Sequence, residues 1–213
     1  HDVDIDFHLD FDLDPAGMTL GYVCEMAERY RWGGRVAVGH VSKLSALPSD
    51  RLAAAARWMA DAGVALTVLP STDLYLMGGD SDGNVPRGVA PAHRIAGHGV
   101  TCALSTNNVL NPFTPFGDCS MARMANLYAN VGQVGSRAGL EGCLDMVTAA
   151  PARLMRLDDY GLAVGNPADI VVLDAVSAAD AVREIAVPLY GFKRGVRTFT
   201  RQPARLHRPV DRA

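Results

Sequence analysis

The sequence lacks the paired cysteines of zinc ribbons and thioredoxin-type redox sites. Its four cysteines, at positions 24, 102, 119 and 143, form no C-x-x-C motif, which disfavours both classes. Each cysteine lies in an apolar or helical pattern. We therefore expect buried thiols in a reducing, cytoplasmic compartment.

The marks of several other protein classes are also missing. No run reaches the roughly 20 apolar residues of a membrane span, and the first residues show no secretory signal. The chain has 20 Lys and Arg against 23 Asp and Glu, without a basic run, which argues against nucleic-acid binding. A G-x-S-x-G elbow, a P-loop, a G-x-G-x-x-G turn after a strand and the H-x-E…P-C-x-x-C zinc deaminase signature are absent too.

What the sequence does contain is a repeated strand-and-helix pattern. Short apolar segments begin near residues 3, 35, 64 and 100, and helical periodicity follows the first two. Such alternation predicts a parallel sheet with helical crossovers. A complete barrel of this type takes eight such units. The sequence therefore predicts an α/β fold with a parallel sheet, and its four units are half the number that a (β/α)8 TIM-like barrel needs.

The remaining segments are assigned from the same signals. We expect barrel strands at 3–8, 35–40, 64–69 and 100–104, helices at 18–31, 50–62, 91–97, 118–131, 140–148 and 151–157, a strand at 170–173, and a hairpin over 190–194 and 196–200. Glycine and proline in 70–91 predict a long loop, which we interpret as a lid or pocket wall. An insertion without a role is the alternative. Tyr75 in this segment offers a stacking face to a planar ring.

Polar side chains stand where the expected strands end. His8 and His40 close the first two strands, Asp73 follows the third, and Asn107 and Asn108 follow the fourth. The carboxyl ends of parallel strands gather functional side chains, so the two histidines are expected to face the same mouth. Neutral imidazole is the commonest metal ligand. The alternative is that each histidine is a hydrogen-bonded core residue.

Four segments, in order along nearly the whole chain, resemble one known family. They are HLDFDLDP at 8–15, VGHVSKLSALP at 38–48, LSTNNVLNPFTPFG at 104–117 and YGLAVGNPADIVVLDA at 160–175. The chain resembles the C-terminal half of the amidohydrolase superfamily, in the branch of cytosine deaminases and N-isopropylammelide amidohydrolases.

The resemblance implies a fold and a domain organisation. It implies that 1–158 forms strands five to eight of a (β/α)8 barrel, that 159–200 returns to a small flanking β-sandwich, and that 201–213 is a tail. Four strands do not close a barrel. We therefore expect the missing N-terminal half of the same protein as a partner, or another copy of the chain as a homo-oligomer.

The resemblance also implies a mechanism. The family uses one divalent metal, zinc or iron, to activate water for attack at a ring C–N centre. His8 would be a metal ligand. His40 would orient the metal-bound hydroxide or polarise the substrate, and is a possible second ligand. Asn107 stands where the family has a catalytic aspartate, with Asn108 beside it.

Two residues depart from the family pattern. Phe11 occupies the position of a catalytic glutamate and transfers no proton, and Asn107 is a neutral amide that brings no charge to a cation. We therefore expect the metal to be weakly bound or absent in this chain. Asp10, Asp12 or Asp73 would then have to carry out the acid–base catalysis.

Two hypotheses follow. The first is a hydrolase of non-peptide C–N bonds in a small heterocycle or cyclic amide. In it His40 and Asn107 are catalytic, and Tyr75, Asn108 and Asp73 contact the substrate. The second is a catalytically degenerate member that serves as a small-molecule binding or interaction module. Neither involves nucleic acid or a membrane.

Overall fold

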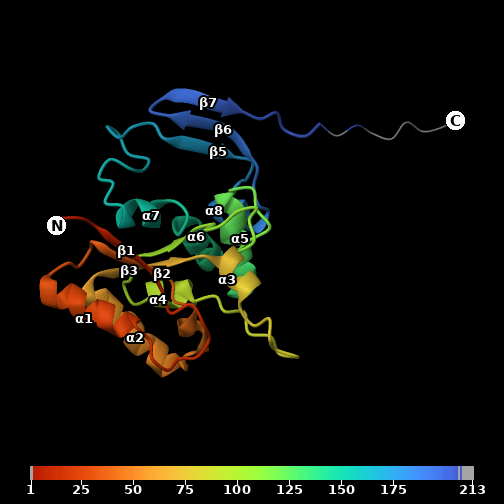
Figure 1. Ribbon diagram of the computed structural model, residues 1–213. Coiled ribbons are helices and arrows are strands. Elements are labelled where there is room, and N and C mark those ends of the chain that lie inside the picture. The colour runs from red at the N-terminus through yellow and green to blue at the C-terminus, as the bar shows by residue number, and fades with distance from the viewer. Residues whose placement is uncertain (1, 206, 208–213) are drawn as a thin grey trace.

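The four-stranded parallel sheet is the centre of the fold. The computed structural model describes residues 2–205 and 207 (Figure 1). Strands β1 (Ile5–Leu9), β2 (Val36–His40), β3 (Val64–Val68) and β4 (Cys102–Leu104) are hydrogen-bonded in that order, and every pair is parallel. The four expected strands and the half-barrel are confirmed.

One face of this sheet forms the hydrophobic core. Helices α1 (Leu20–Tyr30) and α2 (Ser49–Ala62) lie against it, side by side in Figure 1. Their buried side chains recur at helical spacing and meet every second residue of the strands, as expected for amphipathic elements. The residues in this contact include Leu20, Cys24, Ala27, Leu52, Ala56, Met59, Val36, Val38, Val64, Leu66 and Val68.

The opposite face carries smaller or polar side chains. The register places Asp6 beside Ala37 and His8 beside Gly39, and Ala65 and Thr67 alternate with the buried residues of β3. Barrel interiors are usually filled by bulky branched side chains, so this face leaves open space. A cavity of about 480 Å³ lies at its N-terminal end, bounded in part by Asp6, Ala37 and Thr67.

The rest of the chain adds short helices and a second sheet. These elements are η1 (Ser42–Ala46), α3 (Pro70–Leu76), α4 (Ala92–Ala96), α5 (Met121–Val131), α6 (Arg137–Asp145), α7 (Ala149–Leu154), β5 (Ile170–Leu173), α8 (Ala178–Arg183), β6 (Pro188–Lys193) and β7 (Val196–Thr200). Strands β5, β6 and β7 form a small antiparallel sheet, drawn in blue at the top of Figure 1. The expected hairpin is thus present. The expected tail lies partly outside the described residues.

Three expectations need correction. The segment 70–91 begins with helix α3, because Pro70 at the first helical position is pre-organised for a helix. Helix α8 was not expected, although the Ser177 hydroxyl caps it by accepting from the Asp180 N–H. Cys119 is exposed, since it lies in an irregular segment before α5, whereas the other cysteines are buried. Within the described part of the chain, no helix is long and apolar enough to cross a membrane.

Candidate active site

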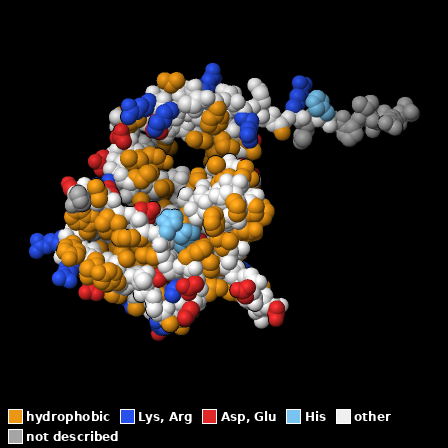
Figure 2. Space-filling model, viewed as in Figure 1, with side chains coloured by type: hydrophobic (Ala, Val, Ile, Leu, Met, Phe, Trp, Pro, Cys, Tyr) orange, Lys and Arg blue, Asp and Glu red, His pale blue; other side chains and the backbone are white. Residues whose placement is uncertain are grey.

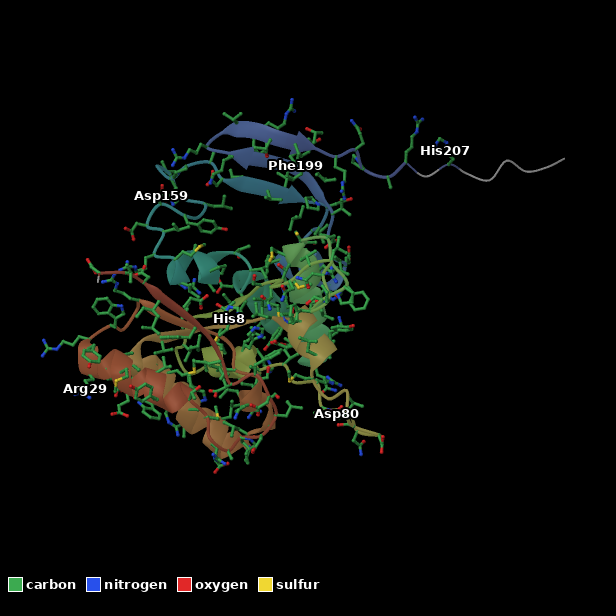
Figure 3. The ribbon with its side chains drawn as sticks, in the orientation of Figure 1. His8, Arg29, Asp80, Asp159, Phe199 and His207 are labelled. Carbon is green, nitrogen blue, oxygen red and sulfur yellow. The ribbon has the colours of Figure 1, made fainter. Side chains whose placement is uncertain are left out.

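His8 and His40 meet at the carboxyl end of the sheet. Their ring centroids lie 4.9 Å apart with an interplanar angle of 76°. The position is set by the strand register, because His8 is paired with Gly39. A Cβ on Gly39 would lie 3.2 Å from Cδ2 of His8, so the glycine leaves room for the ring. Figure 3 labels His8 near the middle of the fold, and Figure 2 shows histidine exposed on this face beside hydrophobic side chains.

The backbone at His40 is turned sharply out of the strand. His40 has a φ of 66° and Val41 has a φ of 49°. Left-handed backbone is unusual for any residue with a side chain, and it is an outlier for a β-branched one. Strain of this kind persists only where the surroundings hold it, and it clusters at functional sites. Here the Val41 N–H donates to the Leu9 carbonyl at 3.2 Å, which ties the turn to β1.

His40 is held by a buried carboxylate. Its Nδ1 lies 2.6 Å from Oδ1 of Asp73, a residue that is 0% exposed. The other carboxylate oxygen accepts from the Leu69 N–H at 3.3 Å. Burial raises the pKa of Asp73, and the hydrogen bond from His40 opposes that rise. Asp73 was expected to contact substrate; its side chain is instead enclosed and faces the imidazole.

The amide of Asn107 faces the other ring nitrogen. Its Nδ2 lies 3.5 Å from Nε2 of His40. In the tautomer whose Nδ1–H donates to the Asp73 carboxylate, Nε2 carries the lone pair, and the amide of Asn107 faces it. Asn107 has a φ of 56°, a conformation that asparagine tolerates better than most residues. The Oδ1 of Asn108 accepts from Nδ2 of Asn111 at 2.8 Å.

Phe11 covers His40. The two ring centroids are 4.3 Å apart, and Phe11 is 36% exposed whereas His40 is 5% exposed. The neighbouring acids are not available as bases beside His40. Asp10 accepts from the backbone N–H groups of Thr19 and Leu20 and so caps α1. Asp12 forms an ion pair with Lys43 at 3.2 Å.

An aromatic pair, called the rim below, lies close to the site along the chain, because Tyr75 follows Asp73 by two residues in α3. Tyr75 on α3 and Phe116 are both partly exposed, and their rings meet edge to face with centroids 5.5 Å apart. Beneath them, the buried hydroxyls of Thr72 and Thr114 are hydrogen-bonded at 2.5 Å. The segment 70–76 is therefore helical rather than a loop. Tyr75 is exposed, and its role in stacking on a ligand stays a prediction.

These residues do not by themselves fit a hydrolytic metal centre. Such a centre takes about three protein ligands and an open position for water. The described residues contain no group of three or more His, Cys, Asp or Glu side chains arranged to hold a metal ion. His8 has one acidic neighbour, Asp6, at 3.9 Å, and Asn107 offers only a neutral oxygen.

Comparisons with known proteins agree on one family. A model described as "Amidohydrolase family" matches residues 1–199. Over 176 residues the chain is 30% identical to a pterin deaminase of Rhizobium rhizogenes, covering 81% of this chain and 40% of that protein. Over 197 residues it is 24% identical to N-isopropylammelide isopropyl amidohydrolase of Pseudomonas sp. (strain ADP), covering 92% and 45%. The chain thus spans less than half the length of these two curated relatives.

Solved structures show the same fold. The structure of 5-methylcytosine deaminase from Klebsiella pneumoniae with 5-fluorocytosine superposes with a TM-score of 0.91 at 25% identity, covering 97% of this chain and 50% of that one. The expected kinship with cytosine deaminases and N-isopropylammelide amidohydrolases is confirmed. Zinc occurs in this fold: a variant of atrazine chlorohydrolase from Arthrobacter aurescens, complexed with zinc and atraton, has a TM-score of 0.63 at 22% identity, covering 92% of this chain and 44% of that one.

Proposed function

Because the chain belongs to the amidohydrolase family, we propose that it hydrolyses a carbon–nitrogen bond of a small heterocycle or cyclic amide at the site around His40. The observation that carries the proposal is the contact between His40 and Asp73. Burying a carboxylate beside an imidazole costs free energy of folding. Buried titratable pairs of this kind concentrate at functional sites.

The geometry gives His40 a defined role. With Asp73 bonded to Nδ1, Nε2 is free to accept a proton from a water or from a substrate N–H. The positive charge that then develops on the ring is stabilised by the adjacent carboxylate. His40 is the catalytic residue in this proposal and Asp73 is a positioning residue. The Asn107 amide orients the ligand group that approaches Nε2.

The rim favours a planar ligand. Tyr75 and Phe116 offer exposed aromatic surface, and Phe11 adds a third ring beside His40. Aromatic faces bind flat, weakly polar rings by stacking and by burial of apolar area. This surface fits a neutral heterocycle better than a charged, flexible amide. Pterins and pyrimidines, on which the named relatives act, belong to that class.

A second candidate function is binding without turnover. It is favoured by one observation: Phe11 and Asn107 both contact the His40 ring, and neither side chain transfers a proton. In this alternative the site recognises the same planar rings, and His40 accepts a hydrogen bond from the ligand rather than a proton.

One experiment separates the two. The chain is incubated with pterin, 5-methylcytosine and N-isopropylammelide, and ring absorbance and ammonia or amine release are followed while binding is measured by calorimetry. For a hydrolase, His40→Asn lowers kcat on the order of a hundredfold or more, whereas the exposed control His98→Asn leaves it unchanged. Binding without release supports the second candidate. Neither binding nor release contradicts both.

A further inference from the structure

The hydroxyls of Thr72 and Thr114 are hydrogen-bonded to each other and join two separate segments of the chain. They lie 2.5 Å apart, and the residues are 1% and 0% exposed. The direction of the bond is settled by a second contact, because the Thr114 hydroxyl donates to the Phe113 carbonyl at 2.8 Å. Thr72 is therefore the donor and Thr114 the acceptor.

The first threonine belongs to the helix that holds one side of His40. Thr72 and Asp73 are adjacent in the first turn of α3. Asp73 reaches Nδ1 of His40. A helix this short has little stability of its own, so its position depends on such tertiary contacts. Displacement of Thr72 would move the Asp73 carboxylate with it.

The second threonine belongs to the turn that holds the other side. Asn111 Oδ1 accepts from the Thr114 N–H at 3.1 Å, and Asn111 Nδ2 donates to Asn108 at 2.8 Å. Asn108 directly follows Asn107, whose amide faces Nε2 of His40. The side chain of Asn111 thereby joins Thr114 to the strand end that carries Asn107.

These contacts close a ring around the imidazole. One arm runs from His40 through Asp73 to Thr72, the other runs from His40 through Asn107 to Thr114, and the two hydroxyls join the arms. We propose that Thr72 and Thr114 are positioning residues, whose hydrogen bond sets the two side chains on opposite edges of His40 in one geometry. The inference rests on the proposed function only in taking His40 as the reactive group.

The test removes the hydroxyl without changing the shape. Thr72→Val and Thr114→Val are compared with Thr72→Ser, which restores the donor. The readout is the imidazole proton of His40 in ¹H–¹⁵N NMR, identified by its absence in His40→Asn. In the unmodified chain the Nδ1 proton is expected downfield and protected, since it is buried and bonded to a carboxylate. Both valine variants are expected to shift or broaden it, and the serine variant to restore it.

Turnover gives a second readout. If the hydroxyl pair sets the geometry, the valine variants lower kcat on the order of tenfold to a hundredfold and change KM far less, because misplacement acts on the reacting atoms rather than on the rim. Thr148→Val is the matched control. It removes a hydroxyl whose bond, among the described residues, goes to the Leu144 carbonyl near the end of α6, at 2.7 Å, and is expected to leave the His40 signal unchanged.

The outcomes are distinct. If folded Thr72→Val gives the same His40 signal as the unmodified chain, the inference is overturned, whether or not the variant turns over substrate. So would an equal shift in Thr148→Val, which would indicate a general loss of stability. A shifted signal in a chain that turns over none of the substrates would support the positioning role while contradicting the proposed hydrolysis. A thermal melt of each variant verifies that it is folded.

Discussion

The His8 ring lies over Gly39, its register partner on the neighbouring strand. A side chain at position 39 would enter the space of the ring, since the added Cβ would lie 3.2 Å from Cδ2 and 3.3 Å from Nε2 of His8. The distance between the two histidines thus depends on a residue that has no functional group of its own.

Gly39→Ala is expected to weaken ligand binding more than it weakens the fold. The backbone at Gly39 is not in the left-handed region, so alanine fits β2 and only the His8 ring has to move by a few tenths of an ångström. The free energy of unfolding should change by about 1 kcal/mol or less, while binding falls several-fold by calorimetry. Gly79→Ala, where nothing lies within 4 Å, is the control. Equal losses of binding in both variants would contradict the idea.

Asp73→Asn is expected to impair the site by reversing the hydrogen bond to His40. The amide N–H can donate to Nδ1, which leaves the proton on Nε2, the nitrogen that the proposed chemistry needs free. We expect kcat to fall on the order of a hundredfold or more and the downfield Nδ1 proton to vanish from the NMR spectrum. Retention of that proton together with normal turnover would remove Asp73 from the proposal.

Asn107→Asp is expected to increase metal retention. The substitution places a carboxylate near the imidazole of His40, whose ring meets that of His8, and a charged oxygen binds a divalent cation better than an amide does. Elemental analysis of the protein before and after the substitution measures the effect. The unmodified chain should retain little zinc or iron after dialysis. Stoichiometric metal in it would instead show that the ligands are sufficient without the aspartate.

Thiol titration should find one reactive cysteine in the native protein. Cys119 is exposed, whereas burial raises the pKa of Cys24 and Cys143 to about 11 and that of Cys102 to about 12. At pH 8 an aromatic disulfide reagent should label Cys119 alone, and all four cysteines in denaturant. Cys119→Ser should abolish the native reaction. Fast labelling of a second thiol would contradict the buried packing.

The same pKa values predict how stability changes in alkali. The folded state keeps these thiol protons up to about pH 11 to 12, whereas the unfolded chain loses them near 9.0, the ordinary value for a thiol. The unfolded state therefore binds fewer protons in this window, and the free energy of unfolding falls as pH rises through it. Denaturant melts between pH 8 and 11 measure the slope, and Cys102→Ala should reduce it.

Much of the scaffold was predictable because its signals are local. Alternation in β1 and the apolar run of β2 placed His8 and His40 at strand ends, and the geometry of parallel strands brought them to one edge. The same reasoning could not find the contact between His40 and Asp73. That contact requires α3 to begin directly after β3, and the glycines and prolines further along 70–91 obscured the helix. Pro70 at its first position was the signal that could have revealed it.

Other parts of the site depend on irregular backbone. The pairing of Thr72 with Thr114 joins residues 42 positions apart through a turn organised by Asn111, and no periodicity predicts such a turn. The role of Asp10 was also hidden. Its place beside Phe11 suggested a substitute base, but its carboxylate accepts from three donors at the start of α1, a cap formed across nine to ten residues.

The two left-handed residues at the end of β2 have a consequence for the order of folding. His40 and Val41 adopt a backbone that costs on the order of 1–3 kcal/mol each, and the Leu9 carbonyl of β1 is the partner that retains it. Until β1 has docked, the turn is expected to relax and the imidazole to swing away from Asp73. The contact between His40 and Asp73 is then expected to form late in folding, and fraying of the first strand is expected to break it before the core melts.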